Sequence, residues 1–446
     1  MLWPTASEDK AVLPDGLPLT LSAYRLLTAA ASPLAPVLVS HRLKRGKEDP
    51  ERLAERYGQT KRARPAGPLV WVHSASVGEL LAVAPLVARM REKDLNVLCT
   101  SGTLTSAKVA EQRLPAGVIH QFVALDTPRF VRRFFEHWRP DLALFVESDL
   151  WPNLIIAGAK RGMPLILVNG RLSEDSFRRW RRAPGTISGL LRCFDLCLAQ
   201  SAAHAARYRE LGAPRVATTG NLKLDVPEPP ADPGALAALR STIGTRTVVA
   251  GASTHAGEET LLVEAHRRLH GSFPQLLTII APRHPDRGSG ILEIAHAANL
   301  KARLRSRGEL PAADTDIYVA DTMGELGLIY RVAPVVFVGG SLASHGGQNP
   351  IEAIKLGAAV LHGPHVWNFA EIYDALDKAR GAGQVTDAGE LAVRVGAWLK
   401  DADERATVVA AAREAIEPLG GALERTVAAI EPYLMQIRLE RREAHA

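Results

Sequence analysis

The chain has 446 residues, enough for two or three domains with substantial cores. Apolar residues make up 47% and charged residues 23% of it, which is typical of a soluble globular protein and argues against disorder. The net charge is +6, and residues 41–64 alone hold nine Lys or Arg against four Asp or Glu, a balance of +5. The rest of the chain is almost neutral, so a nucleic-acid partner is not expected.

The N-terminal region combines an apolar segment with this basic one. After a polar leader of about 16 residues, the segment 17–40 is apolar but is interrupted by Arg25 and three prolines. It is therefore not expected to span a membrane, and the acidic leader argues against a signal peptide. Residues 1–47 are predicted either to lie on a membrane, with the basic residues meeting anionic headgroups, or to form a packed helix followed by a solvated charged turn.

Cysteine and histidine usage gives no metal or disulfide signal. The three cysteines, Cys99, Cys193 and Cys197, make no disulfide framework, and no His or Cys cluster with zinc spacing is evident. The sequence fits a reducing cytoplasm, and we expect no bound metal and no cofactor.

From residue 68 on, short Val/Ile/Leu-rich runs alternate with helical segments, the pattern of parallel α/β sheets. The first series of predicted strands is LVWVH, NVLCTS, LALFVES, PLILVN, LCLAQS and RVATTG. The second is TVVAGAS, LLTIIAPRH, IYVAD, PVVFVGG and AAVLHGP. We expect two doubly wound domains, 48–224 and 241–446, joined by a proline-rich linker at 225–240, with the last helix crossing back to the first domain. Ligands would bind at the carboxyl ends of the strands.

In the second half, a strand followed by a glycine-rich loop predicts a phosphate site within FVGGSLASHGGQNPIEAI, residues 337–354. Asn349 is a good helix cap and Pro350 suits a first turn, so the following helix would offer free N–H groups to a phosphate. Glu352 is placed to accept ribose hydroxyls, and Arg283 follows another strand. The alternative is a glycine-rich turn with a capped helix and a surface Arg.

Two further loops of this half carry polar residues. GASTHAGEE (251–259) offers a small-residue turn, or alternatively a capping box in which Ser253 or Thr254 pairs with a Glu. DTMGELGLIY (321–330) is a loop and short helix whose backbone groups could contact a nucleotide base. The alternative is a helix that is capped by Asp321 or Thr322.

The first half places acidic residues where strands end. In WVHSASVGELLAVAPLVARM (71–90), Glu79 stands where a strand turns into a helix. Glu147 and Asp149 follow another strand, where two close carboxylates raise each other's pKa for acid/base work or serve as helix caps. Lys223, in GNLKLD, is either a cleft cation or a solvated surface charge.

Together these motifs resemble one family. Nine motifs occur in order over about 300 residues: WVHSASVGE, FVESDLWPNLI, VNGRLSEDS, GNLKLD, ASTHAGEE, PRHPDR, DTMGELGLIY, VGGSLASHGGQNPIE and HGPHVWNFAEI. This ordered set resembles the 3-deoxy-D-manno-octulosonic acid (Kdo) transferases of lipopolysaccharide synthesis. GKEDPERLAERYG resembles the family's membrane-proximal N-terminus.

The resemblance implies a glycosyltransferase B fold, with two Rossmann-like domains facing a central cleft. It implies transfer of Kdo from CMP-Kdo to the lipid A precursor lipid IVA, with inversion and without a metal, at the cytoplasmic face of the inner membrane. By the same match Glu79 is the general base, and Glu147 and Lys223 stabilise the transition state. The residues matched to the CMP site are Pro282, Arg283, Met323, Gly324, Glu325, Asn349, Pro350, Ile351 and Glu352.

The sequence departs from the family pattern at Asp149, Gly170, Gln348 and Ala353, where Glu, Ala, His and Pro are usual. Two rival functions remain: another two-domain glycosyltransferase or an epimerase that uses a UDP-sugar, and an inactive relative that binds anionic lipid or a partner. Retention of Glu79, Arg283 and Glu352 together argues against the second.

Overall fold

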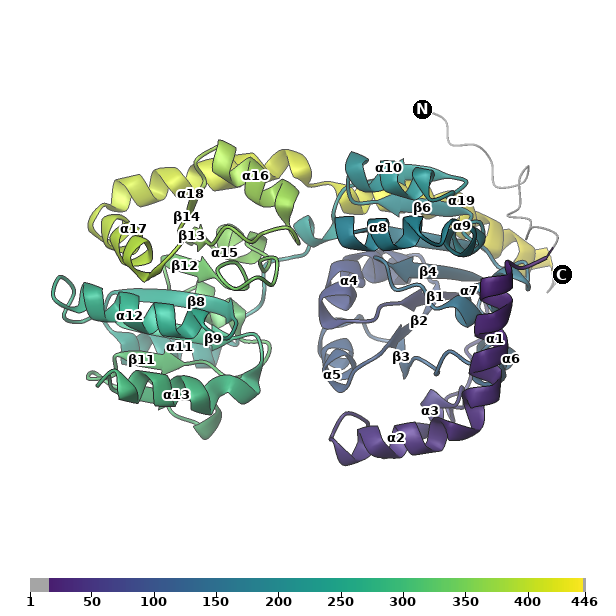
Figure 1. Ribbon diagram of the computed structural model, residues 1–446, viewed down its shortest axis with the longest axis horizontal. Helices are drawn as coiled ribbons and strands as arrows, with labels where there is room; N and C mark the ends of the chain where they lie inside the picture. The colour runs from purple at the N-terminus through teal and green to yellow at the C-terminus, as the bar shows by residue number, and fades with distance from the viewer. Residues whose placement is uncertain (1–15, 444–446) are drawn as a thin grey trace. The chain divides into compact units, whose positions relative to one another are not determined.

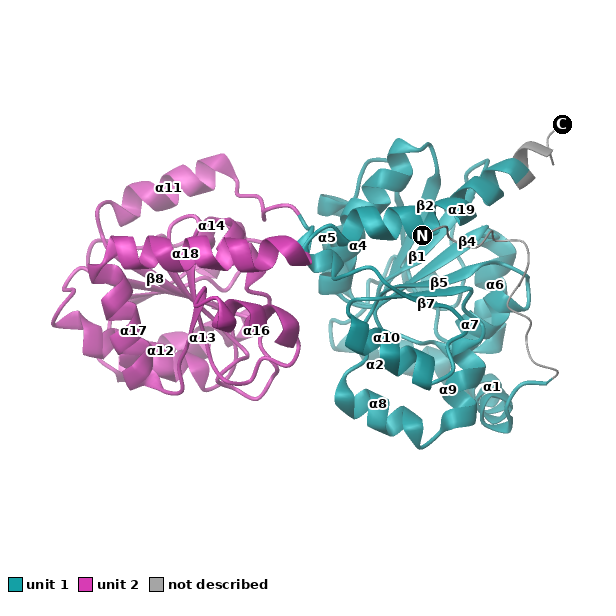
Figure 2. Ribbon diagram, turned by 90° about the horizontal axis from the view of Figure 1, so that it is seen from above, with its two compact units in different colours: residues 1–226, 420–446 teal, residues 227–419 magenta. Residues whose placement is uncertain are grey.

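The computed structural model describes residues 16–443, with side chains for residues 16–439, so the polar leader lies almost wholly outside the described residues. The chain forms two compact units (Figure 2). Unit 1 holds the chain up to Val226 together with the residues from Gly420 on, and unit 2 holds Pro227–Leu419.

Unit 1 is built on a seven-stranded parallel sheet with the strand order β3-β2-β1-β4-β5-β6-β7. Strands β3, β2, β1, β4 and β6 of this sheet are labelled in Figure 1. Its strands are β1 Leu69–His73, β2 Asn96–Ser101, β3 Ile119–Phe122, β4 Leu142–Val146, β5 Leu165–Gly170, β6 Leu196–Ala199 and β7 Val216–Thr218. Its helices are α1 Leu19–Ala31, α2 Ala35–Lys44, α3 Leu53–Arg56, α4 Val77–Glu92, α5 Leu104–Arg113, α6 Pro128–Trp138, α7 Pro152–Ala159, α8 Glu174–Arg181, α9 Pro184–Leu191, α10 Ala202–Glu210 and α19 Ala422–Glu443. Short 3-10 turns lie at Ser32–Leu34 and Leu222–Leu224.

The unit 1 sheet is buried on both faces because helices cover each of them. Alternate residues of β1 enter different cores: Leu69 and Trp71 pack with α6, α7 and α9, whereas Val70 and Val72 pack with α4 and α19. The last helix, α19, buries Ile430 and Leu434 in the second of these cores. A C-terminal segment therefore completes the N-terminal unit.

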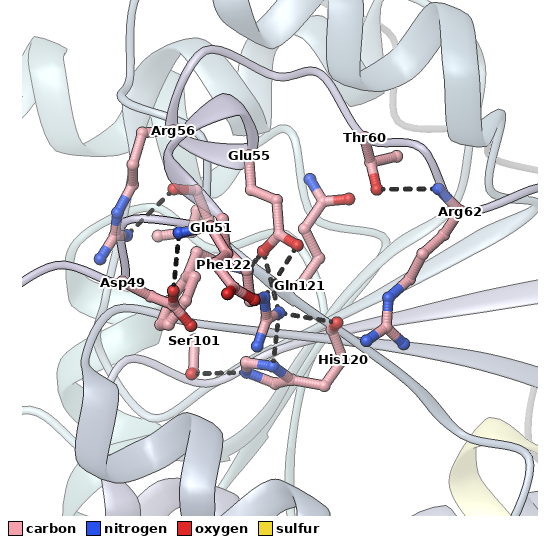
Figure 3. A network of polar contacts seen from close by, with 12 residues as sticks. Asp49, Glu51, Glu55, Arg56, Thr60, Arg62, Ser101, His120, Gln121 and Phe122 are labelled. Atoms are coloured by element: carbon pink, nitrogen blue, oxygen red, sulfur yellow. Dashed lines mark hydrogen bonds and ion pairs between the residues drawn. The ribbon is translucent and has the colours of Figure 1, made fainter.

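A network of buried charges fixes the segment after α2 to the edge of the sheet. Arg56 is buried and donates to Glu48 (2.8 Å) and to backbone carbonyls that follow β2 and β3. Glu55 pairs with Arg52 and accepts a hydrogen bond from the backbone N–H of Phe122 in β3 (2.7 Å; Figure 3). Because each carboxylate has a cationic or N–H partner, the charges are compensated despite their burial.

Helices α1 and α2 bury few of their apolar side chains. Leu21, Ala35 and Val39 are buried, and the Tyr24 hydroxyl donates to Asp126 (2.9 Å). Large apolar side chains nonetheless remain exposed along both helices and the turn between them, at Leu19, Leu26, Leu27, Leu34, Val37 and Leu38. Within residues 16–443, no helix is both long and apolar enough to cross a membrane.

Unit 2 repeats the architecture with the strand order β10-β11-β9-β8-β12-β13-β14, again all parallel. Its strands are β8 Val248–Thr254, β9 Leu277–Pro282, β10 Ala302–Leu304, β11 Ile317–Val319, β12 Val335–Val338, β13 Ala359–His362 and β14 Ala382–Gln384. Its helices are α11 Pro233–Ile243, α12 Glu258–His270, α13 Gly288–Ala297, α14 Leu326–Tyr330, α15 Ile351–Lys355, α16 Ala370–Lys378, α17 Ala388–Lys400 and α18 Ala402–Ile416, with 3-10 turns at Pro285–Arg287, Arg305–Arg307 and Glu417–Leu419. Helices α12, α13 and α17 enclose its main core.

The predicted fold class, two parallel α/β domains, is confirmed. One difference concerns the stretch predicted as a linker, 225–240, because helix α11 begins within it at Pro233. Asp232 explains the early start: its side chain accepts a hydrogen bond from the N–H of Ala235 (2.7 Å), and Pro233 fits the first helical position.

Candidate functional site

In unit 1 the polar residues gather where the strand order changes direction, between β1 and β4. Such a switch point leaves a crevice outside the carboxyl ends of the two strands, where doubly wound folds bind ligands. Glu79 lies in the first turn of the helix after β1, and Glu147 directly follows β4. The topology alone therefore brings the two predicted residues to one place.

Glu79 is held by the start of its own helix. Ser76 is the N-cap of α4, and its Oγ accepts a hydrogen bond from the Glu79 N–H (3.3 Å) and donates one to Glu79 Oε1 (3.1 Å). The N–H of Ala75 donates to Oε2 (2.7 Å). Burial, followed by the nearby Glu147 charge, nevertheless raises the pKa of Glu79 to about 7. The carboxylate is thus oriented and is a far better base than an ordinary Glu.

Glu147 is buried and bound by a cation. Lys223 Nζ lies 2.5 Å from Glu147 Oε1, and Asn169 Nδ2 lies 3.5 Å from the same oxygen. Glu147 and Asn169 both have a positive φ, 60° and 54°, which is rare for residues other than glycine. Backbone strain of this kind is typical of functional sites, where surrounding contacts maintain it.

Asp149 does not behave as the predicted partner of Glu147. Burial alone would raise the pKa of Asp149, but contact with His73 (Nε2 to Oδ2, 3.4 Å) and a hydrogen bond from Trp151 hold it below its ordinary value. The raised pKa predicted for Asp149 is therefore wrong, whereas the pKa of the nearby Glu79 is raised. The capping alternative is wrong too, since Asp126 caps α7.

In unit 2 the corresponding switch point lies between β8 and β12. Gly339 permits the two strand ends to meet there: a Cβ at this position would lie 2.6 Å from the Ser253 carbonyl oxygen. Pro282 ends the neighbouring strand β9, and the N–H of Arg283 donates to the Thr254 carbonyl (2.9 Å). The Arg283 side chain is partly exposed at this edge of the sheet.

The glycine-rich loop is anchored by Glu258, a buried residue that sequence reasoning did not single out. Its carboxylate accepts hydrogen bonds from four consecutive backbone N–H groups of residues 340–343 (2.8–3.1 Å) and from the N–H of His255 (2.8 Å). The alternative of a capping box at 251–259 is found only in part: the Thr254 hydroxyl donates to Glu259 Oε1 (3.4 Å), but Gly257 stands at the helix start without a side-chain cap. Gln348, where the family pattern has His, bridges to the His255 ring (Nε2 to Nε2, 3.2 Å).

The residues Met323, Gly324 and Glu325 follow β11 and lead into α14. Met323 is exposed and Gly324 has a φ of 84°. The Glu325 carboxylate forms a two-pronged ion pair with Arg305 (2.5 Å for each contact), which holds the pKa of Glu325 below its ordinary value. Capping of this helix by Asp321 or Thr322 is not found, because Asp321 instead accepts from the N–H of Ser306.

The segment from Asn349 to Glu352 leads into α15, which has only five residues. Asn349 is not the N-cap as predicted; Pro350 holds that position, and Ile351 is the first helical residue. The reason is local: Asn349 Oδ1 accepts from the Ile351 N–H (3.1 Å), so the side chain closes a turn just before the helix. Glu352 is partly buried, in the first turn, as predicted.

The structure thus places the predicted residues in two groups. Glu79, Glu147 and Lys223 come together at the switch point of unit 1. The nine residues predicted to bind CMP lie at or after the carboxyl ends of β9, β11 and β12; β9 and β11 are neighbours, and β8 separates them from β12. Glu258 and Arg305 are the supporting residues that the sequence pattern does not reveal.

Comparison with known proteins gives a consistent family. A family model described as 3-Deoxy-D-manno-octulosonic-acid transferase (kdotransferase) matches residues 51–226. The 3-deoxy-D-manno-octulosonic acid transferase of Bordetella pertussis is 34% identical over 428 residues, covering 92% of this chain and 99% of the relative. That of Haemophilus influenzae is 33% identical over 391 residues, covering 86% of this chain and 92% of the relative.

Solved structures confirm the fold class. A glycosyltransferase from Rickettsia africae covers 83% of this chain and 99% of its own, with 10% identity and a TM-score of 0.58. The UDP-GlcNAc 2-epimerase from Neisseria meningitidis covers 82% and 100%, with 10% identity and a TM-score of 0.57. Identities this low establish shared architecture alone, whereas the two relatives establish the family. The chain belongs to the 3-deoxy-D-manno-octulosonic acid (Kdo) transferases and is a glycosyltransferase.

Proposed function

We propose that this chain transfers Kdo from CMP-Kdo to the lipid A precursor lipid IVA, with inversion, in lipopolysaccharide biosynthesis at the cytoplasmic face of the inner membrane. The observation that carries the proposal is the Glu79 carboxylate, oriented at the switch point of unit 1 with a pKa raised to about 7. A general base works best when its pKa lies near the working pH. A protein that only bound lipid would not need such a group.

In this reaction Glu79 accepts the proton of an acceptor sugar hydroxyl. The hydroxyl oxygen attacks the anomeric carbon of Kdo, the bond from that carbon to the CMP phosphate oxygen breaks, and CMP leaves with the bonding electrons. Attack opposite the leaving group inverts the anomeric configuration, and no covalent sugar–enzyme intermediate is needed. Lys223 and Glu147 form a charge pair at the same switch point, which supports a role in stabilising charge that develops in the transition state.

The donor would bind to unit 2. Arg283 provides a cation for the phosphate beside the end of β9, and Glu352 provides acceptors for the ribose hydroxyls. The backbone at Met323, Gly324 and Glu325 would meet the cytosine. Pro282, Asn349, Pro350 and Ile351 would complete the site. The Arg305–Glu325 ion pair supports this assignment, because it fixes the loop that the cytosine would contact.

The acceptor is a phosphorylated, acylated lipid, and the N-terminal helices suit it. Six large apolar side chains of α1, α2 and the turn between them are exposed, and Lys44, Arg45 and Lys47 follow at the end of α2. An apolar surface bordered by lysine and arginine binds bilayers that contain anionic lipid. We propose that this surface holds the enzyme on the membrane.

The activity is tested by incubating the wild type and Glu79→Gln with CMP-Kdo, generated in situ, and tetraacylated lipid A precursor. The wild type should form a product whose mass gives the number of Kdo units added. The variant should lose transfer by at least about 100-fold while it still binds CMP. Preference for UDP over CMP in a binding assay would support the rival UDP-sugar enzyme. Normal turnover by Glu79→Gln would refute the proposed base.

Membrane binding has its own test with a matched control. A triple variant, Leu26→Ser, Leu27→Ser and Val37→Ser, should float with anionic vesicles much less than the wild type while its melting temperature stays the same. Val393→Ser changes a side chain that is 75% exposed in unit 2 and should float normally. Equal flotation of the triple variant would contradict the assignment of this surface.

A further inference from the structure

Two histidines and an aspartate come together near the amino ends of the unit 2 strands, whereas the proposed donor site lies at the carboxyl ends. His266 and His270 lie in the last turns of α12, and Asp316 directly precedes β11. All strands of this sheet are parallel, so the residue before β11 lies at the amino edge, whereas the proposed donor residues follow the carboxyl ends. The proposed function gives this cluster no role.

The three side chains can converge on one point. His266 and His270 are four residues apart, which places them on the same face of the helix. One ligand atom of each of the three residues lies within 4.8 Å of the others, and His266 Nε2 is 3.9 Å from Asp316 Oδ1. Tetrahedral zinc with bonds of about 2.0–2.1 Å needs ligand atoms about 3.3 Å apart. His270 is exposed and can rotate to close the difference. The expectation that the sequence lacks zinc-type spacing overlooked this pair.

His266 provides the strongest sign of a ligand. The residue is 1% exposed, and its Nδ1 is 2.9 Å from the Thr278 hydroxyl, yet its buried Nε2 has no hydrogen-bond partner. A buried polar atom without a partner costs about 1–3 kcal/mol, so native structures seldom contain one without a reason. When Nδ1–H donates to the Thr278 hydroxyl, Nε2 keeps a lone pair for a ligand, and Asp316 Oδ1 lies 3.9 Å away; a hydrogen bond from the other ring nitrogen is what orients metal-binding histidines.

The charges around the site also allow a cation. Asp316 Oδ2 accepts from the Lys301 N–H (2.8 Å), which fixes the carboxylate and leaves Oδ1 toward His266. Arg246 lies nearby, but its guanidinium donates to four backbone carbonyls, of Gln275, Leu276, Ala312 and Thr315. Its charge should weaken binding to the micromolar range rather than prevent it.

We propose that His266, His270 and Asp316 form a site for a divalent transition-metal ion, with Zn²⁺ the best match to two imidazoles and one carboxylate. Water would fill the remaining position on the exposed side. The ion links the end of α12 to the start of β11. Because it lies at the amino edge of the sheet, it stabilises unit 2 and takes no part in transfer.

The test uses the full chain without a histidine tag, freed of metal by a chelator and then titrated with Zn²⁺. We expect one equivalent to bind with micromolar affinity and to raise the melting temperature of unit 2. Co²⁺ should give the visible absorption of a four- or five-coordinate site. His270→Ala and Asp316→Asn should each weaken binding at least 30-fold; the first changes an exposed side chain, and the second keeps an oxygen for the Lys301 N–H.

The matched control is His296→Ala, an exposed histidine at the end of α13, which should bind the metal as the wild type does. Circular dichroism of each variant shows that it is folded. CMP binding should be the same with and without Zn²⁺, which keeps this proposal separate from the proposed function. Absence of binding in the wild type, or binding of equal strength in His270→Ala and Asp316→Asn, would overturn the site.

Discussion

Glu79 performs two tasks with one carboxylate. It closes the first turn of α4 with Ser76, as in a capping box, and it is the proposed base. Because the base must be ionised and its pKa is raised to about 7, kcat/KM should fall about tenfold per pH unit below pH 7. The check is the pH profile of kcat/KM between about pH 5 and pH 9. A profile flat down to pH 5 would show that another group takes the proton.

The same raised pKa predicts an effect on stability. The folded state holds the Glu79 proton more tightly than the unfolded chain does, so between the ordinary pKa of 4.5 and about 7 the folded protein binds more protons. Stability from this residue is therefore present at low pH and is lost as the pH rises through 7. Since Glu79 is only partly buried, Glu79→Gln should stabilise the protein at pH 8 by about 1 kcal/mol and lose that advantage below about pH 5. Urea unfolding at the two pH values measures the difference.

Lys223 and Glu147 should behave as a unit. Both side chains are mostly buried, at 17% and 11% exposed, so Lys223→Met leaves an uncompensated carboxylate and should cost about 3 kcal/mol. The double variant with Glu147→Gln should recover most of that stability but none of the activity. A double-mutant cycle, by urea unfolding and transfer assay, separates the two roles. If the double variant is as unstable as the single one, the pair does not explain the stability of this site.

Helices and loops show what holds the donor side in place. Glu258, at the start of α12, accepts five backbone N–H groups, four of them from the loop after β12. Glu258→Gln replaces one accepting oxygen with a donor, so the loop should loosen. We expect KM for CMP-Kdo to rise about tenfold or more, with a smaller change in kcat, and unit 2 to melt earlier. Glu264→Gln, on an outer face of the same helix, should leave both unchanged.

The strands inside each sheet could be predicted from sequence, whereas the missed ones lie at sheet edges. The central strands β1, β4 and β5 are fully buried and apolar except near the carboxyl ends of β1 and β5, at His73 and Asn169, which produces the nearly continuous hydrophobic runs of a parallel sheet. The missed strands are β3, β10 and β14, each at an edge. The residues of β3 are IHQF, and β10 and β14 have three residues each, so neither length nor pattern distinguishes them from loops.

Part of the candidate site follows from the same logic and part does not. Glu79 and Glu147 could be predicted because each follows a strand, and strands β1 and β4 prove to be neighbours. The partners of Glu258 and Glu325 could not be predicted. Arg305 is 20 residues from Glu325, and the loop that binds Glu258 is more than 80 residues away, so only the folded backbone brings them together.

At the scale of the whole molecule, the two units differ in how the chain builds them. Unit 2 is one continuous segment, Pro227–Leu419, with its own core. Unit 1 needs both ends of the chain, because α19 buries Ala422, Ala429, Ile430, Leu434 and Ile437 against the sheet. A nascent chain therefore cannot complete unit 1 until α19 has been synthesised, after the whole of unit 2.

This difference predicts unequal fragments. Residues 227–419 expressed alone should fold cooperatively and bind CMP, if the proposed donor site is right. Residues 1–226 alone should lack the α19 face of their core and expose Val70, Val72 and their neighbours, giving an aggregating or molten state. Joining residues 420–446 to this fragment through a flexible linker should restore a cooperative thermal transition. Circular dichroism and calorimetry of the three fragments make the comparison. Cooperative unfolding of 1–226 without α19 would show that the packing of this helix contributes little to unit 1.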